Sequence, residues 1–344
     1  MHIINKLLDL NVAAATSVIG GAGLWYGLRR LERRLGERAI VLMGTMAAFV
    51  FAAQMVNFPA GPCSGHLLGG VLAAALVGPW AGAVVIAAVL IVQCLLFGDG
   101  GLMALGANFI NMGLVGAVGG YAIYAPIRRA VGGSRGVIVG AMAAAWFSVL
   151  LAAGAFSVEL AVSGHWADFL QVLSWMTLVH AVIGLGEAVI TGLVLRFILL
   201  TRPDLIYEPD SDAVAGGIDE RLSSSRWYQL GAAGLAISLA VGIILAPFAS
   251  DAPDGLEYVG QHLGFIKATP APSLPVLIPD YDARALTGLS SLKLATAVAA
   301  VVGTLTVFCL AIVIASVFAR RGPASHGMSS SPPAGPAEVA AHAP

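Results

Sequence analysis

Long apolar stretches, separated by short polar connections, run along the chain from near its start to residue 318. A helix needs roughly 20 apolar residues to cross the hydrocarbon core of a membrane. The third apolar stretch is too short for an ordinary spanning helix, so we expect a broken or tilted element whose ends are buried in protein. The pattern predicts an all-α polytopic membrane protein with segments at 8–28, 39–58, 66–78, 80–97, 102–125, 136–161, 169–200, 227–248 and 292–318.

Composition supports this class. The chain is 58% hydrophobic and 11% charged, whereas soluble domains are about one quarter charged. A formal net charge of −1 gives no basic surface for nucleic acid, so no nucleic-acid partner is expected. The three cysteines show no CxxC spacing, which indicates neither a disulfide framework nor a thiolate zinc site.

The basic residues predict the orientation. With the N-terminus outside and the C-terminus in the cytoplasm, the basic loops at 29–38, 126–135 and 201–226 are cytoplasmic. Only four of the 18 basic residues then lie outside, namely Lys6, Lys267, Arg284 and Lys293, as the positive-inside rule requires. The arginine cluster after the first apolar segment also favours a retained first helix over a cleaved signal peptide.

The polar segments divide the chain into two blocks. The first, 1–200, contains seven apolar segments joined by short connections. A polar cytoplasmic linker, 201–226, leads to a pair of spans over 227–318 that enclose an outside loop at 249–291. The tail, 319–344, is rich in Ser, Pro, Ala and Gly, and we expect it to be disordered.

Three of the seven histidines are candidates for chemistry: His2, His66 and His180. The others lie in the tail (His326, His342) or in expected outside loops (His165, His262), where a solvated histidine needs no function.

The first two residues of the chain could chelate a metal ion. The free amine of Met1, the deprotonated backbone nitrogen of His2 and the His2 imidazole form two fused rings around a metal ion. Three nitrogens in one plane suit Ni(II) or Cu(II). His66, between glycines and on the same predicted side, could supply a fourth nitrogen. The alternative is a frayed terminus with no function, the commoner fate of chain ends.

Polar residues within apolar segments form a second group of candidates. For the Gln and Asn residues we expect hydrogen bonds between helices. His180 and Glu187 share one helix face, two turns apart. A buried Glu187 needs a partner, and contact with a metal ligand is one possibility. The group comprises Gln54, Asn57, Gln93, Asp99, Asn108, Asn111, His180 and Glu187.

Three common catalytic or nucleotide-binding motifs are missing from the sequence. There is no GxxxxGK[ST] loop, nucleophile elbow or HExxH pair. The chain therefore cannot hydrolyse ATP by the P-loop route, and we do not expect an enzyme.

Several short motifs together resemble the CbiM/NikM family, the substrate-binding membrane subunits (S components) of nickel and cobalt energy-coupling-factor transporters. The resemblance covers about residues 1–200. A second resemblance, at 253–257 (PDGLE), is to the signature of the small accessory subunit, here fused to the first block. The motifs of the first block are 1–3 (MHI), 54–59 (QMVNFP), 64–70 (SGHLLGG), 98–102 (GDGGL), 104–108 (ALGAN), 111–113 (NMG) and 180–187 (HAVIGLGE).

The resemblance implies a seven-helix metal-binding bundle with the N-terminus at its centre. It implies that the Met1 amine, the His2 amide and imidazole, and His66 hold the metal. Residues in the matching motifs that could contact these ligands are Asn57, Ser64, Asn108, Asn111, His180 and Glu187. One departure is the stretch 4–10 (INKLLDL), where the family has an acidic, glycine-containing segment, so the terminus could be held differently.

The resemblance also implies the partners. Transport would need a transmembrane coupling (T) subunit and cytoplasmic ATP-binding-cassette subunits. The chain itself would cross the lipid bilayer of a bacterial or archaeal cytoplasmic membrane several times. No permanently bound cofactor is expected, because Ni(II) or Co(II) is the transported ion. Four planar nitrogens favour nickel. The alternatives are a metal sensor or structural membrane module without transport, and a self-sufficient permease.

Overall fold

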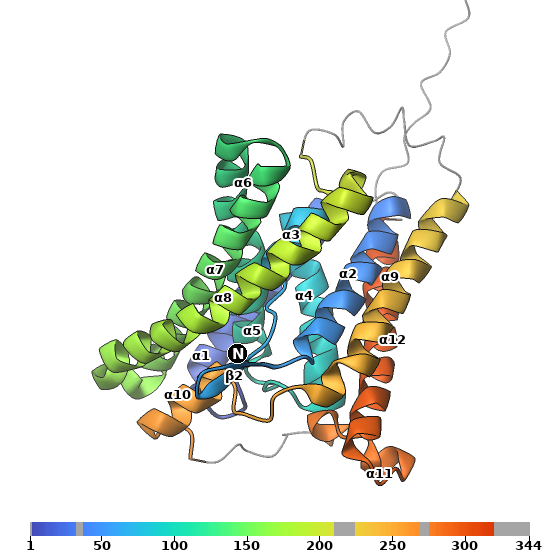
Figure 1. The fold of residues 1–344 in the computed structure, drawn as a ribbon. Coiled ribbons are helices and arrows are strands. Elements are labelled where there is room, and N and C mark those ends of the chain that lie inside the picture. Colours follow the sequence, from blue (N-terminus) through green and yellow to red (C-terminus); the bar gives the residue numbers. More distant parts are fainter. Residues whose placement is uncertain (1, 32–36, 210–223, 268–274, 320–344) are drawn as a thin grey trace, which may run out of the picture.

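Long helices make up most of the computed structural model, which describes residues 2–31, 37–209, 224–267 and 275–319 (Figure 1). Five helical stretches among these residues are long and apolar enough to cross a membrane. The multi-pass helical prediction is thereby confirmed, while the number and direction of the spans remain predictions. The longest helices are α1 (Leu10–Leu31), α2 (Glu37–Gln54), α4 (Pro79–Val92), α7 (Gly133–Leu160), α8 (Phe169–Thr201), α9 (Ser224–Ile244) and α12 (Leu292–Ala319).

Shorter elements complete the first block. Helix α3 (Gly70–Val77) has only eight residues, and the flanking Gly69 and Gly78 are buried, as expected for the short third segment. Gly78 has a φ of 88° and Pro79 opens α4, a position where proline loses no hydrogen bond. The other elements are η1 (Gln93–Phe97), α5 (Leu105–Asn108), η2 (Phe109–Gly119), α6 (Gly120–Val131), η3 (Ala161–His165), η4 (Trp166–Asp168) and η5 (Pro203–Leu205).

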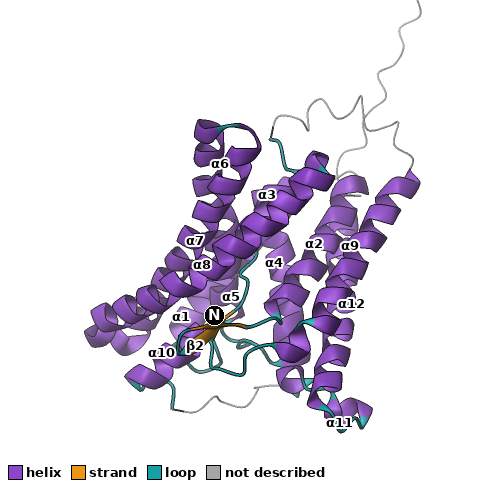
Figure 2. Ribbon diagram, viewed as in Figure 1, coloured by secondary structure: helices purple, strands orange, loops and turns teal. Residues whose placement is uncertain are grey.

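A small β-hairpin corrects the all-α prediction (Figure 2). The helix expected over 39–58 ends at Gln54, and strands β1 (Phe58–Ala60) and β2 (Cys63–Gly65) pair antiparallel. Two prolines within 58–65 exclude a helix interior, and Gly61 turns the chain with a φ of 69°. The third segment likewise begins as a helix at Gly70 rather than at residue 66, so His66 lies in an extended connection.

The C-terminal block packs on the first block along α2 (Figure 1). Small residues allow close approach: a Cβ added at Gly303 of α12 would lie 2.1 Å from Phe51, and one at Gly234 of α9 would lie 2.2 Å from Thr45. Both helices therefore fit against α2 only with glycine at these positions.

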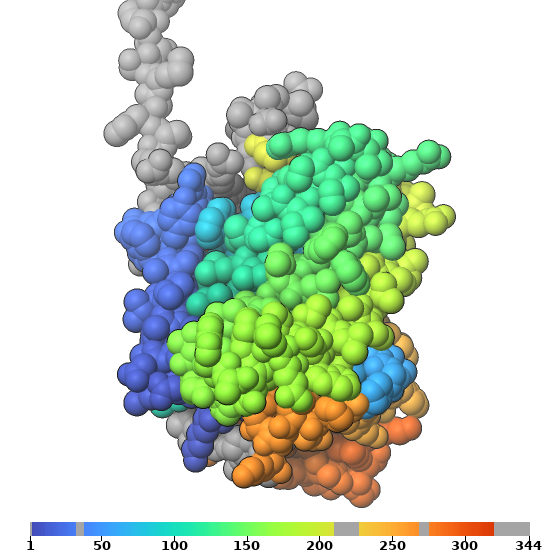
Figure 3. Space-filling view, turned by 90° about the vertical axis from the view of Figure 1, so that its left-hand side faces the viewer, coloured from blue at the N-terminus to red at the C-terminus, as the bar shows by residue number. Residues whose placement is uncertain are grey.

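The loop expected at 249–291 is folded against the bundle in its described parts. Helix α10 packs on α8 and β2, and Figure 3 shows it in orange beside the lime-coloured helices. The short elements around this loop are η8 (Ala246–Phe248), α10 (Gly255–Leu263), η9 (Pro279–Tyr281) and α11 (Arg284–Thr287).

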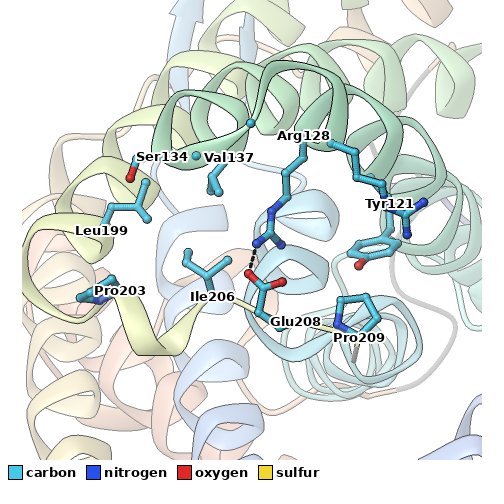
Figure 4. A pocket seen from close by; sticks show the side chains of 13 residues that line it. Tyr121, Arg128, Ser134, Val137, Leu199, Pro203, Ile206, Glu208 and Pro209 are labelled. Carbon is cyan, nitrogen blue, oxygen red and sulfur yellow. Dashed lines mark hydrogen bonds and ion pairs between the residues drawn. The ribbon is translucent and has the colours of Figure 1, made fainter. Parts of the chain in front are cut away.

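The connections predicted to be cytoplasmic share one end of the molecule. The α6–α7 turn and the C-terminal end of α8 lie at the end opposite α10 and α11 (Figure 1). A cavity of about 490 Å³ opens there, and an ion pair joins Arg128 of α6 to Glu208, which follows α8 (Figure 4). Most of the linker that begins here, and the tail from residue 320, lie outside the described residues.

The crossing of α1 over α5 gives a stability prediction. A Cβ at Gly106 would lie 2.3 Å from the Cα atom of Ser17, and backbone cannot yield as a side chain can. Gly106→Ala should lower the free energy of unfolding by about 1–3 kcal/mol, the usual cost of overpacking, measured as a lower melting temperature in detergent. Gly21→Ala, on α1 and with nothing within 4 Å of the added Cβ, is the control and should be neutral or slightly stabilising. Equal melting temperatures for the two variants would contradict this packing.

Candidate metal centre

The N-terminal segment lies inside the bundle (Figure 1). His2 is 7% exposed and Ile3 is fully buried. The Asn108 amide binds the backbone of Ile3 twice: its Oδ1 accepts from the Ile3 N–H at 2.8 Å and its Nδ2 donates to the Ile3 carbonyl at 3.2 Å. The Gly101 N–H donates to the same carbonyl at 2.7 Å. The frayed-terminus alternative is therefore wrong for these two residues, while Met1 itself lies outside the described residues.

Two consecutive glycines allow this approach. A Cβ at Gly101 would lie 2.5 Å from the backbone nitrogen of Asn5, and one at Gly100 would lie 3.0 Å from the Asn108 amide. Gly100 also has a φ of 84°, a conformation that other residues rarely adopt. The GDGG sequence, residues 98–101, thus packs directly against the N-terminal segment.

A chain of amides orients the His2 ring. The His2 Nε2 lies 3.1 Å from Gln93 Oε1, and the Gln93 Nε2 donates to Gln54 Oε1 at 2.8 Å. The Gln54 Nε2 in turn donates to the Leu68 carbonyl at 3.0 Å. Because an amide oxygen only accepts, the His2 Nε2 carries a proton, and in the neutral ring Nδ1 holds the lone pair.

The His2 Nδ1 faces a carboxylate. It lies 3.2 Å from Asp99 Oδ1. A lone pair and a carboxylate oxygen repel each other unless a proton or a cation lies between or beside them. This side of the ring is therefore suited to bind a positive ion.

His66 approaches from the connection between β2 and α3. Its ring stacks near that of His2, with centroids 5.2 Å apart and planes inclined by 20°. Its Nδ1 lies 3.1 Å from the Leu67 carbonyl, so Nδ1 donates and Nε2 holds the lone pair. Burial, together with the nearby His2, lowers the pKa of His66. This favours the neutral imidazole, the form that binds metals.

Glu187 holds the connection that carries His66. This fully buried carboxylate on α8 accepts the Leu68 N–H at 2.5 Å and the Gly69 N–H at 2.9 Å. Both N–H groups precede α3 and have no partner within it. Glu187 thus positions the backbone that follows His66, whereas a direct contact of Glu187 with a metal ligand stays a prediction.

The donors at this site are mainly nitrogens. Among the described residues, no group of three or more His, Cys, Asp or Glu side chains is arranged to hold a metal. The two imidazoles would therefore need further ligands to hold a metal ion.

The sequence of this region matches a known protein family. Residues 2–205 match the CbiM family, described as the cobalt uptake substrate-specific transmembrane region. The chain belongs to the CbiM family. A PDGLE domain follows over residues 229–320, so the fusion predicted from the sequence is confirmed.

Known relatives share the fused architecture. The chain is 35% identical over 312 residues to the putative fused nickel transport protein NikMN of Archaeoglobus fulgidus, covering 90% of this chain and 96% of the relative. It is 34% identical over 222 residues to the fused nickel transport protein NikMN of Rhodobacter capsulatus, covering 60% and 64%. A solved structure of a transition metal transporter is 26% identical, with a TM-score of 0.55, and covers 64% of this chain and all of its own.

Two of the predicted residues connect the CbiM region to the PDGLE domain. The Ser64 N–H donates to the Pro253 carbonyl at 2.8 Å, and its Oγ donates to the Ala252 carbonyl at 2.7 Å. The Asn57 carbonyl accepts the Ser250 N–H at 2.9 Å. The hairpin before His66 is thus joined to the PDGLE sequence itself.

The other predicted residues do not touch the His2 ring in the described contacts. Asn111 donates to Glu159 at 2.9 Å. The His180 Nδ1 lies 2.8 Å from the Met176 carbonyl of its own helix. With His66 and Asp254, His180 lines a cavity of about 20 Å³, large enough for one water molecule. His180 and Glu187 do share the buried face of α8, as predicted.

Some contacts of the candidate site were not predicted from the sequence. Gln93 was expected only to bridge helices, and Asp99 had no assigned role; their signal was a polar side chain within or beside an apolar run. Tyr281 donates to Asp99 from 182 positions along the chain, and no local pattern indicates such a contact.

Glu187 gives the second prediction. Glu187→Ala would leave two buried N–H groups without an acceptor, and each costs about 1–3 kcal/mol. Hydrogen–deuterium exchange at the Leu68 and Gly69 amides should accelerate strongly, with a lower melting temperature. Leu193→Ala, at a 63% exposed position of the same helix, should change neither. Unaltered exchange at both amides would show that Glu187 does not hold this connection.

Proposed function

We propose that this chain captures Ni(II) or Co(II) outside the cell as the substrate-binding component of an energy-coupling-factor transporter. The observation that carries the proposal is the pair of neighbouring imidazoles, His2 and His66, held beside a buried N-terminal segment. The names of its relatives as nickel and cobalt transport proteins support it.

The proposed ligands are four nitrogens. They are the Met1 amine, the His2 backbone nitrogen, the His2 Nδ1 and the His66 Nε2. The two ring nitrogens are those left with lone pairs by the bonds to Gln93 and Leu67. Nitrogen ligands in a plane favour Ni(II) over Co(II), so nickel is the expected substrate.

Burial of the N-terminal segment supports tight binding of the metal ion. The Ile3 backbone is already bound by Asn108 and Gly101, so little conformational entropy is lost when an ion arrives. Amide, amine and imidazole must all be deprotonated to bind, and metal binding therefore releases protons.

Energy for transport comes, in this proposal, from separate subunits. The chain has no P-loop, and ATP hydrolysis is assigned to cytoplasmic ATP-binding-cassette partners acting through a transmembrane coupling subunit. The basic connections gathered at one end of the molecule (Figure 1) support a cytoplasmic face there, with the metal centre loaded from the other side.

The ligand set gives a direct binding test. One residue added before Met1 moves the amine out of the chelate, and His66→Ala removes a nitrogen. Each change should weaken Ni(II) binding to the purified protein by about 100-fold or more, since even outer contacts of metal ligands are worth 10–100-fold. Isothermal titration with Ni, Co, Cu and Zn measures this. His165→Ala is the matched control. Unchanged nickel and cobalt affinity in both site variants would refute the proposed site.

Transport gives a separate test. In a cell lacking its own nickel uptake, this chain alone should give no accumulation of radioactive nickel above background, because it has no energy source. Coexpression with a coupling subunit and ATPases should restore uptake. Accumulation by the chain alone would instead favour the self-sufficient permease, and tight binding without transport in either case would favour a sensor.

A further inference from the structure

A segment of the PDGLE domain, which includes Ile278 and Tyr281, reaches the residues around His2. Ile278 and Ala283 are fully buried in the main hydrophobic core. The Ile278 N–H donates to the Leu96 carbonyl of η1 at 2.9 Å. This segment is thereby joined to the π-helical end of α4, the element that also carries Gln93.

The backbone around Tyr281 is held in an unfavourable conformation. Asp280 and Tyr281 have φ angles of 50° and 57°, a left-handed conformation that is strained for non-glycine residues. Packing offsets this cost, because the Tyr281 ring stacks on Phe97 with centroids 4.5 Å apart and planes inclined by 19°. The left-handed turn directs the ring into the bundle.

The Tyr281 hydroxyl lies among the polar groups around His2. It donates to Asp99 Oδ2 at 2.6 Å, and the other oxygen of the same carboxylate lies 3.2 Å from the His2 Nδ1. The Gln93 side chain accepts from the opposite nitrogen of the ring. The hydroxyl thus holds one of the two residues that flank the imidazole.

We propose that Tyr281 is a positioning residue of the metal site, acting through Asp99 on the His2 imidazole. This rests on the proposed function, in which His2 Nδ1 binds the ion. With Oδ2 held by Tyr281, Oδ1 faces Nδ1 and places a negative charge beside an incoming divalent cation. Without the hydroxyl, the Asp99 carboxylate can rotate away from His2. The His2 ring is then oriented by Gln93 alone.

The consequence is that the PDGLE domain supplies part of the metal centre within the same chain. Asp99 is 29% exposed at its side chain, so only a specific partner fixes which oxygen faces the ring. That partner belongs to the C-terminal block, whereas the ligands belong to the CbiM region.

The test uses the purified full-length chain with its native N-terminus and Ni(II) as the probe. Tyr281→Phe removes only the hydroxyl and keeps the ring on Phe97. It should weaken Ni(II) binding about 10-fold or more and shift the visible absorption of the bound nickel, with the melting temperature of the metal-free protein nearly unchanged. Tyr228→Phe, at a 65% exposed position of the same block, should alter none of these quantities.

A double-mutant cycle separates positioning from a general structural role. If Tyr281 acts through Asp99, the double variant Asp99→Ala/Tyr281→Phe should bind nickel no more weakly than Asp99→Ala alone, because coupled residues are not additive. Full additivity would overturn the proposal, as would wild-type affinity and spectrum for Tyr281→Phe. If N-terminal extension abolishes binding while Tyr281→Phe does not affect it, only this inference fails. If the unmodified chain binds no nickel, both proposals fail.

Discussion

The proposed metal centre depends on one constraint, namely that the N-terminal segment, described from His2 onward, is held inside an apolar bundle. Backbone groups buried away from water must find partners, and the Asn108 amide satisfies both the N–H and the carbonyl of Ile3. Gly101 adds a third bond and approaches closely because it has no side chain. A segment that would otherwise fray thus becomes a fixed wall of the site. In the proposed chelate, this is what brings a terminal amine and a backbone nitrogen to a metal ion.

The polar groups around this segment form a continuous set of contacts. Gln54 and Gln93 connect the Leu68 carbonyl to the His2 ring, while Glu187 binds the neighbouring N–H groups. Polar atoms are costly in an apolar bundle unless they are paired. The same pairing therefore stabilises the fold and orients both imidazoles, and a change to one member is expected to affect stability and metal binding together.

Fusion of the two regions gives the C-terminal block a defined place in this arrangement. Ser64 joins the hairpin before His66 to the PDGLE sequence, and Ile278 joins a later segment to the end of α4. In separate chains these contacts would have to form by association, whereas here the chain connection keeps both partners at high effective concentration.

The amino-acid sequence by itself determined the class of protein, the positions of most helices and the two histidines of the site. The length of the apolar segments and the position of the basic loops are set by the surrounding lipid, so both can be read from short stretches of sequence. Met1-His2 and the glycine-flanked His66 are likewise short motifs. Pro59 disfavours helical backbone at Phe58, so it already indicated that the helix expected over 39–58 ends earlier. Only the tertiary structure decided which polar residues meet. Asn111 pairs with Glu159 rather than the site, and Tyr281 reaches Asp99 across 182 positions, because such contacts arise from the packing of whole helices and leave no periodic trace in the chain.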